Sequence, residues 1–243
     1  MVLTNCGNCA NRLVVHKDST KPPQVSHKNT KLMHMANIGF IPQQAKLIHF
    51  SHPEPVKHIA EMARIAYRSK QKNFYKDEKL VRLLLKRGHL TPFEFVTATF
   101  QIICDRAIAN EITRHRHFSF VQESTRYCNY DNRPIAFINP LECLNNNCIS
   151  NEIKRITENA TQISYESYCA LVESGVRPEI ARSVLPLNIA TKLVMCGNLR
   201  SWMHFLELRT DKAAHPLMRQ LAFSIQEQLQ NIIPQAFPTN QKD

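Results

Sequence analysis

The chain has 243 residues, 43% of them hydrophobic and 21% charged, which is typical of a globular protein with its own core. Its formal net charge of +11 favours anionic partners such as nucleic acid, anionic lipid or phosphorylated small molecules. No apolar run approaches the roughly 20 residues of a membrane span, and the first residues do not have the pattern of a secretory signal. We therefore expect a cytoplasmic protein with no membrane partner.

Cysteine and glycine usage narrows the chemistry further. The eight cysteines are scattered, so we expect free thiols, and the single CxxC pair, Cys6 and Cys9, has no second pair at zinc spacing. We therefore predict no metal site. Only five glycines are present, and none forms a dinucleotide-binding or P-loop motif. Any bound nucleotide is therefore expected to be held without a glycine-rich phosphate loop.

The N-terminal half begins with a polar, basic stretch. Residues 1–40 lack periodicity and predict a disordered extension. After it, a strand is expected over 45–50, because "AKLIHF" has strand composition. The next expected elements are a helix over 53–69 with Val56, Ile59, Ala60, Ala63 and Tyr67 on one face, a helix over 76–88 ended by Gly88, a strand over 95–105, and a helix over 106–115 capped by Asp105.

The C-terminal half is dominated by helical spacing. A polar break precedes a helix over 152–173, on which residues recur at helical intervals: Ile153, Ile156, Ala160, Ile163 and Ser167 or Tyr168. Because helices and a few strands occur without regular βαβ alternation, we predict an α+β fold, with helices packed on a small mixed or antiparallel sheet. The remaining expectations are a short helix over 177–186, a strand over 187–198, helices over 199–209 and 215–233, a single domain over 45–235 and a tail over 236–243.

The segment "RHRHFSFVQESTRY", from Arg114 to Tyr127, concentrates hydrogen-bond donors at the end of one expected helix. Basic residues there can simply complement the helix dipole in solvent. Arginines interleaved with aromatic residues are also typical of single-stranded nucleic-acid binding. A metal site at His115 and His117 is disfavoured, because residues two apart face different directions on a helix. The fourth interpretation is a phosphate-binding site, since arginine binds phosphate in a bidentate manner.

A second set of basic residues, Arg182, Arg200 and Arg209, lies downstream. Two separate sets of fixed donors suit a site for two nucleotide-like ligands, a cofactor and a substrate. The segment from Arg114 to Tyr127 also resembles the RHRxxSxxxxSxRY motif of the flavin-dependent thymidylate synthases at all seven fixed positions. Three further segments resemble that family: "RGHLTPFEF" (87–95), "ARSVLPLN" (181–188) and "NLRSWMHFLELRT" (198–210).

This resemblance implies an α/β homotetramer whose active sites are shared between subunits. It implies methylation of dUMP to dTMP with methylenetetrahydrofolate as carbon donor, NADPH as reductant and bound FAD as hydride carrier. The positions that match flavin-binding residues are Thr91, Arg114, His115, Arg116, Gln122, Asn198, Arg200 and His204. The positions that match dUMP-binding residues are Glu111, Ile112, Thr113, Arg114, Gln122, Glu123, Ser124, Thr125, Arg126, Arg182 and Arg209.

Three residues are the candidates for catalytic roles under this resemblance. Arg209 is expected against the pyrimidine, where a guanidinium favours loss of the N3 proton and stabilises charge that develops in the ring. His89 matches an active-site histidine. Ser124 is expected on the substrate phosphate, because no histidine–carboxylate pair lies near it in the sequence to activate it as a nucleophile. The backbone of Glu123, with its side chain turned away, is expected to contact the anionic substrate.

Two positions depart from the family pattern, and two other functions stay open. Phe95 stands where the family usually has histidine, and His204 where it often has asparagine, which adds a pH dependence. A nucleic-acid-binding module is the main alternative and would show strong salt dependence. A catalytically inactive homologue is the other, although His89, Ser124, Arg182 and Arg209 are all retained.

Overall fold

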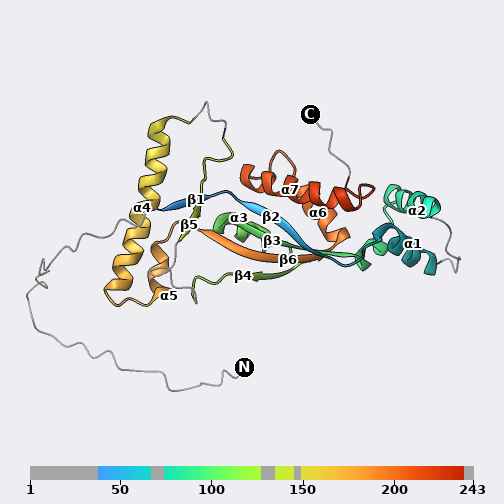
Figure 1. Ribbon diagram of the computed structural model, residues 1–243, viewed down its shortest axis with the longest axis horizontal. Coiled ribbons are helices and arrows are strands. Elements are labelled where there is room, and N and C mark those ends of the chain that lie inside the picture. Colours follow the sequence, from blue (N-terminus) through green and yellow to red (C-terminus); the bar gives the residue numbers. More distant parts are fainter. Residues whose placement is uncertain (1–37, 67–73, 127–134, 145–148, 238–243) are drawn as a thin grey trace, which may run out of the picture. The chain divides into compact units, whose positions relative to one another are not determined.

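A computed structural model describes residues 38–66, 74–126, 135–144 and 149–237 (Figure 1). Most of the predicted extension, the CxxC pair, Tyr67, Tyr127 and most of the predicted tail lie outside these ranges. The described chain begins earlier than the predicted boundary at Ala45, because Gly39–Ile41 already forms strand β1. It also continues into the predicted tail, where Ala236 and Phe237 are buried.

An antiparallel four-stranded sheet carries the main core. The long central strands β3 and β6 pair along their whole length, with Phe100 opposite Met195. The predicted strand over 95–105 corresponds to β3, in which every second residue from Ala98 to Cys104 is buried, as in a strand with one face on the core. The strand order is β2 (Gln44–Phe50), β3 (Thr97–Asp105), β6 (Ala190–Asn198), β4 (Ser119–Gln122).

The helices α6 (Leu199–Arg209) and α7 (Pro216–Ile232) pack on this sheet (Figure 1). Trp202 of α6 is buried and donates its indole N–H to the Ala98 carbonyl over 3.1 Å. Gln228 of α7 bonds both the amide of Leu47 and the carbonyl of Ala45, each at 2.8 Å. The side chain of Gln228 thereby satisfies backbone groups of the edge strand β2.

The helices α1 (Pro55–Ile65) and α2 (Phe74–Lys86) pack against each other and against the core. Their contact includes the ion pair between Arg64 and Asp77, whose side chains are only 9% and 2% exposed, with a 2.5 Å N–O distance. The predicted apolar face of α1 is confirmed in its described part. Its residues Val56, Ile59, Ala60 and Ala63 are buried.

A second cluster of buried residues surrounds the parallel pair of β1 and β5 (Ala136–Ile138). The helix α4 (Asn151–Glu173) contributes Tyr165 and Tyr168 to it. By contrast, the isoleucines that follow helical spacing on α4 are exposed: Ile153 by 40%, Ile156 by 59% and Ile163 by 62%. The described residues therefore leave these isoleucines uncovered, whereas Tyr168, at the end of the predicted series, is buried.

Short elements complete the described chain. The helix α3 (Arg106–Ile112) begins at Asp105, whose carboxylate accepts the Ile108 amide over 2.6 Å as predicted. The remaining turns of helix are η1 (Thr91–Phe95), α5 (Pro178–Ala181) and η3 (Arg182–Val184). Within the described ranges, no helix combines the length and the apolar character needed to cross a membrane. The α+β class is confirmed, with a small antiparallel sheet and a separate parallel pair.

Candidate active site

The basic segment lies in the connection between α3 and β4. The helix α3 ends at Ile112, three residues before the predicted end, and a turn follows in which the His115 amide donates to the Ile112 carbonyl over 3.1 Å. Arg114 closes the same turn with a 3.3 Å bond to the Glu111 carbonyl. Because the chain has left the helix, the consecutive side chains of the segment point in different directions from a fixed backbone.

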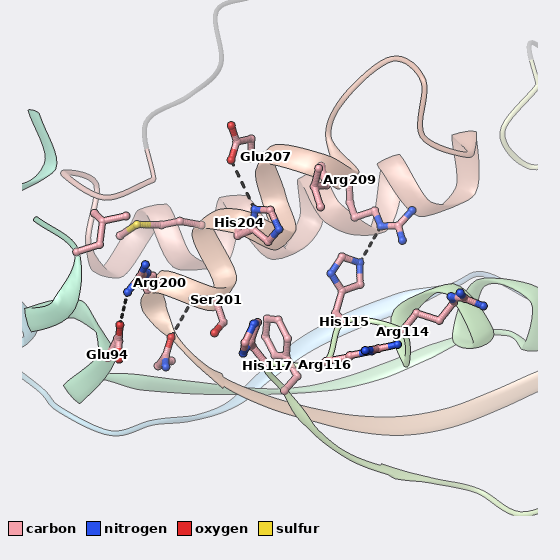
Figure 2. A pocket seen from close by; sticks show the side chains of 15 residues that line it. Glu94, Arg114, His115, Arg116, His117, Arg200, Ser201, His204, Glu207 and Arg209 are labelled. Atoms are coloured by element: carbon pink, nitrogen blue, oxygen red, sulfur yellow. Dashed lines mark hydrogen bonds and ion pairs between the residues drawn. The ribbon is translucent and has the colours of Figure 1, made fainter. Parts of the chain in front are cut away.

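This turn borders a pocket of about 860 Å³. Figure 2 shows that its other walls come from η1 and α6, which are distant from the turn in the sequence. The predicted ligand-binding residues that line it are Arg114, His115, Arg116, Asn198, Arg200, His204 and Arg209. The other lining residues are Leu90, Glu94, His117, Phe118, Ser201, Met203, Glu207 and Leu208.

The ring of Phe118 supports this turn by packing against α6. Its ring contacts Trp202 edge-on at a centroid distance of 4.7 Å and lies 6.1 Å from the Phe205 ring. The approach to β6 is possible only because residue 197 is glycine, since a Cβ there would lie 2.4 Å from the Phe118 ring. Phe118 therefore has a structural role, which answers one part of the nucleic-acid interpretation: its ring is not free to stack on bases.

Arg209 is the most constrained cation of the pocket. Its Nε donates to His115 Nε2 over 2.9 Å, and its Nη1 lies 3.1 Å from Glu111 Oε2. The side chain of Arg209 is 23% exposed, so the guanidinium reaches the pocket but is partly shielded from water. Glu111 does not line the pocket but contacts a residue that does.

His115 is held in its neutral form. Burial lowers its pKa to about 4, and the nearby positive charges of Arg209 and His204 act in the same direction. A neutral imidazole carries one donor and one acceptor. Since Nε2 accepts from Arg209, the ring proton belongs on Nδ1.

Two more polar contacts shape the pocket wall. Arg200 pairs with Glu94 of η1 at 2.5 Å, although both side chains are partly exposed. Asn198 caps α6 by accepting the Ser201 amide over 2.9 Å. His204 is 63% exposed and lies 3.8 Å from Glu207, so its ring faces solvent and the pocket opening. Asn198 therefore combines its predicted place at the site with a structural role at the start of α6.

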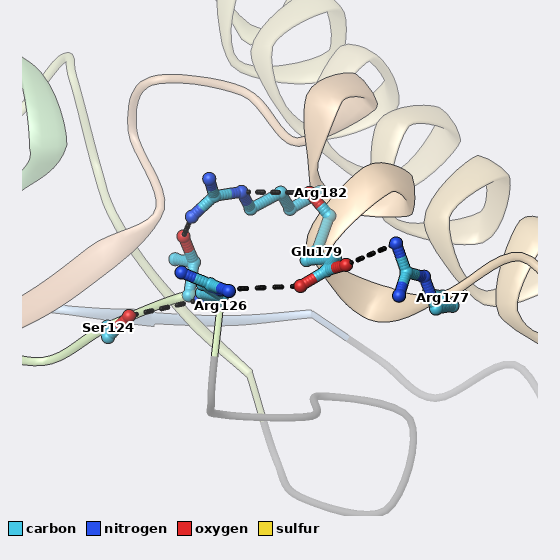
Figure 3. A network of polar contacts seen from close by, with 6 residues as sticks. Ser124, Arg126, Arg177, Glu179 and Arg182 are labelled. Atoms are coloured by element: carbon cyan, nitrogen blue, oxygen red, sulfur yellow. Dashed lines mark hydrogen bonds and ion pairs between the residues drawn. The ribbon is translucent and has the colours of Figure 1, made fainter.

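The remaining predicted phosphate ligands form a second group (Figure 3). The Nε of Arg126 lies 3.3 Å from one carboxylate oxygen of Glu179, and Arg177 lies 2.7 Å from the other. Arg182 donates to the Thr125 hydroxyl over 2.9 Å and to the Glu179 carbonyl over 3.1 Å. The Ser124 hydroxyl accepts the backbone N–H of Arg126 over 3.2 Å.

This second group does not line the pocket within the described part of the chain. The structure therefore brings the predicted residues together in two places rather than one. Gln122 bonds Thr191 at 3.3 Å, and the Glu123 amide donates to the Lys192 carbonyl over 2.9 Å. The amide of Glu123, which was expected to meet the substrate, is thus used in extending the β4–β6 pairing.

Four predicted residues contribute less directly to the pocket. Ile112 is fully buried in the core, and the Thr113 hydroxyl bonds the Asn110 carbonyl at 3.2 Å. His89 and Thr91 do not line the pocket, although Leu90 between them does. Their assigned roles stay predictions.

Several residues of the two groups could not be named from the sequence. Glu94 and Glu179 pair with the predicted ligand residues Arg200 and Arg126, and Phe118 packs against His115. Arg177 in turn pairs with Glu179. Glu94 lies inside the segment 87–95 that resembles the family, and Glu179 lies just before the segment 181–188, but their partners could not be identified from the sequence. No set of three or more His, Cys, Asp or Glu side chains suited to a metal ion is found among the described residues.

Comparison with known proteins identifies the family of this chain. The family profile described as thymidylate synthase complementing protein matches residues 46–235. A flavin-dependent thymidylate synthase of Thermotoga neapolitana is 36% identical over 165 residues, which cover 67% of this chain and 75% of the relative. One from Synechocystis sp. is 33% identical over 192 residues, covering 74% of this chain and 85% of the relative.

The fold also matches a solved structure. The UMP/dUMP methylase PolB from Streptomyces cacaoi, bound with 5-Br dUMP, superimposes with a TM-score of 0.70 and covers 82% of this chain and 95% of its own. Its sequence identity is 22%, so this likeness concerns the fold. The profile match and the relatives confirm the family that the motifs predicted, and the chain belongs to the thymidylate synthase complementing proteins, the family of the flavin-dependent thymidylate synthases.

Proposed function

We propose that this protein methylates dUMP to dTMP, with methylenetetrahydrofolate as carbon donor, NADPH as reductant and FAD as bound cofactor. The observation that carries the proposal is the pocket of about 860 Å³ at the RHRH turn, in which several cations are held at fixed positions. The relatives' shared activity supplies the chemical context. We retain the cytoplasm as the proposed location.

The residues of the pocket fit a flavin dinucleotide. Its volume is within the range of small-molecule and cofactor sites. Arg114, Arg116 and Arg200 supply cationic donors of the kind that a diphosphate needs. Ser201 and Met203 of α6 add one small polar and one apolar side chain to the pocket lining. When bound, the flavin carries reducing equivalents from NADPH; the protein holds and orients it without a glycine-rich loop.

The second group has the chemistry of a phosphate site. Arg126 and Arg182 are placed on neighbouring elements, and Ser124 and Thr125 add hydroxyls between them. We propose that this group takes the phosphate of dUMP. The side chain of Glu179 lies between Arg126 and Arg177 and acts as their counterion while the phosphate is absent.

The separation of the two groups supports a homotetramer with shared sites. If one dUMP molecule places its pyrimidine at Arg209 and its phosphate at Arg126, the pocket and the second group must face the same substrate. Two copies of the chain can satisfy this requirement if the second group of one copy faces the pocket of another. The exposed isoleucines of α4 and the 74% exposed Val121 of β4 offer apolar surface for such packing.

In the proposed reaction, Arg209 acts on the pyrimidine. Uracil C5 is a weak nucleophile. Loss of the N3 proton places negative charge on N3 and the adjacent carbonyl oxygen, where a guanidinium stabilises it, and the electron-rich ring that results makes C5 a better nucleophile toward the methylene carbon. Partial burial strengthens this interaction, because fewer waters compete for the charge. Ser124 serves as a hydrogen-bond donor to the phosphate and not as a nucleophile, since no described contact pairs its hydroxyl with a base.

The nucleic-acid alternative finds less support. Arg200, Arg209 and Arg126 each have a carboxylate partner, Glu94, Glu111 and Glu179 respectively. An open surface that attracts any phosphate backbone is not expected to neutralise its own arginines in this way. The arrangement favours small anionic ligands, each of which binds an arginine in place of its carboxylate partner or beside it.

Release of tritium from dUMP labelled at C5 tests the proposal. The assay contains NADPH and methylenetetrahydrofolate and is run with and without added FAD. We expect release that needs both NADPH and FAD. A folded protein that binds FAD but releases no tritium would contradict methylation of dUMP, and a protein that binds single-stranded nucleic acid but neither FAD nor dUMP would favour the alternative.

A further inference from the structure

Two side chains hold the guanidinium of Arg209. Arg209 is the last residue of α6, and the following Thr210 fixes the helix end with bonds from its amide and hydroxyl to the Leu206 carbonyl at 2.9 and 2.7 Å. From this fixed backbone, Nε reaches His115 and Nη1 reaches Glu111. Figure 2 shows the contact with His115 from the side of the pocket.

The ring of His115 is in turn immobilised by packing. It lies edge-on to Phe205 at a centroid distance of 4.8 Å and to Phe118 at 6.4 Å, with interplanar angles of 66° and 88°. Its backbone is bonded into the turn after α3. Because both aromatic neighbours belong to the core wall, the position of Nε2 follows from the fold and not from a ligand.

Only a neutral ring with its proton on Nδ1 can make this contact. A guanidinium cannot give up a proton, so it always donates, and a doubly protonated imidazole has no acceptor left for it. The charged or titratable groups near the ring are Arg209 and His204 of α6, and Glu111 of α3 pairs with Arg209. Burial, supported by the neighbouring Arg209 and His204, lowers the pKa of His115 to about 4.

We propose that His115 is a positioning residue for Arg209: its Nε2 accepts from Nε and, with Glu111 on Nη1, turns the remaining Nη2 donors toward the pyrimidine. Arg209 makes no further hydrogen bond or ion pair with the described residues, so Nη2 is available to a ligand. This role differs from the flavin contact predicted for His115 from the sequence, and it rests on the proposed function.

A double-mutant cycle distinguishes between two roles of His115, the positioning of Arg209 and the binding of flavin. His115→Phe keeps an aromatic ring but removes the acceptor, whereas His115→Gln retains a side-chain acceptor. Turnover is measured by tritium release per bound FAD, together with FAD occupancy. We expect His115→Phe to lower kcat about tenfold, as for the loss of one hydrogen bond to a charged group, with little change in FAD occupancy. His115→Gln should recover most of this loss.

The same substitution in an Arg209→Ala background provides the decisive comparison. If His115 acts through Arg209, His115→Phe should cause no further loss of turnover there. Equal losses in both backgrounds, or a loss of FAD occupancy that accounts for the loss of turnover, would overturn the proposal. Circular dichroism of each variant checks that the fold is kept.

A spectroscopic measurement tests the contact without turnover. Histidine labelled with ¹³C and ¹⁵N is incorporated into the full chain, and His115→Gln identifies the His115 signals. We expect the Nδ1-protonated tautomer and no titration between about pH 8 and 5, and Arg209→Met should shift the Nε2 resonance. A ring protonated on Nε2, or one that titrates near about 6.5, would refute the contact. Absence of tritium release in the wild type would instead count against the proposed function alone.

Discussion

The ring of Phe118 occupies the space that a side chain at position 197 would need, because a Cβ on Gly197 would lie 2.4 Å from its Cδ1 and Cε1 atoms. This contact joins the basic turn to strand β6. It also fixes the aromatic wall against which His115 packs. The glycine is required here for close approach, and its backbone dihedral is an ordinary one.

Gly197→Ala is therefore expected to destabilise the protein. The added methyl forces Phe118 to move in a packed core, and such overpacking costs about 1–3 kcal/mol of unfolding free energy. Urea unfolding measures the loss, with Gly39→Ala as the matched control, because a Cβ at position 39 meets nothing within 4 Å. Equal stability of both variants would show that the Phe118 ring relaxes freely.

Arg209→Ala should reduce turnover by a factor of about 10² to 10³, as for the removal of one preorganised donor at a developing charge. FAD occupancy should stay near that of the parent, because three other arginines line the pocket. Arg209→Lys keeps the charge but replaces the planar guanidinium, whose separate nitrogens bond His115 and Glu111, by a single ammonium nitrogen, so it should recover little. Turnover near the wild-type value in Arg209→Ala would remove this residue from the mechanism.

Arg114→Ala should lower the FAD content of the purified protein, since a cation at the pocket is lost. The ratio of flavin absorbance to protein absorbance reports occupancy directly. Arg155→Ala, at an exposed position of α4, removes the same charge elsewhere and should leave the ratio unchanged. If both variants retain the parent's flavin content, Arg114 is not a flavin ligand.

Glu179→Gln should tighten dUMP binding. The carboxylate neutralises Arg126 and Arg177, so a substrate phosphate must compete with it. These arginines are 60% and 75% exposed, and such pairs contribute about 0–1 kcal/mol, which corresponds to an affinity gain of up to about fivefold. Titration with dUMP gives the dissociation constant, and Glu158→Gln on α4 serves as control. Weaker binding would mean that Glu179 holds Arg126 in place for the ligand.

Ile156→Glu combined with Ile163→Glu should break the proposed tetramer into smaller species. Both side chains are exposed on one face of α4, and two buried charges in an interface are costly. Light scattering after size-exclusion chromatography measures the mass. Arg155→Glu, on another face of the same helix, should leave the assembly intact. A double variant that stays tetrameric would place the interface elsewhere.

Local sequence signals predicted most of the secondary structure. The strand β3, the cap at Asp105 and the apolar face of α1 are all determined by residues within or next to one element. The four-stranded order and the parallel pair of β1 and β5 were not predicted, because strand pairing is non-local and β1 has only three residues. The apolar spacing on α4 predicted the helix correctly but not that its isoleucines are exposed.

The site was predicted as a set of residue types and not as a geometry. Seven predicted residues do line one pocket. The carboxylate partners of the predicted arginines could not be assigned from the sequence, because Glu94 is 106 residues from Arg200 and Glu179 is 53 residues from Arg126. The division into two groups was also invisible, since it depends on the length and direction of β4, which leads away from the pocket toward Ser124.

The formation of dTMP tests the central claim most directly. The protein is incubated with dUMP, NADPH, FAD and methylenetetrahydrofolate that carries ¹³C in its methylene group, and the nucleotides are analysed by mass spectrometry. We expect dTMP that contains the label, with one NADPH oxidised for each dTMP formed. Oxidation of NADPH without labelled dTMP, by a protein that binds both FAD and dUMP, would contradict the account.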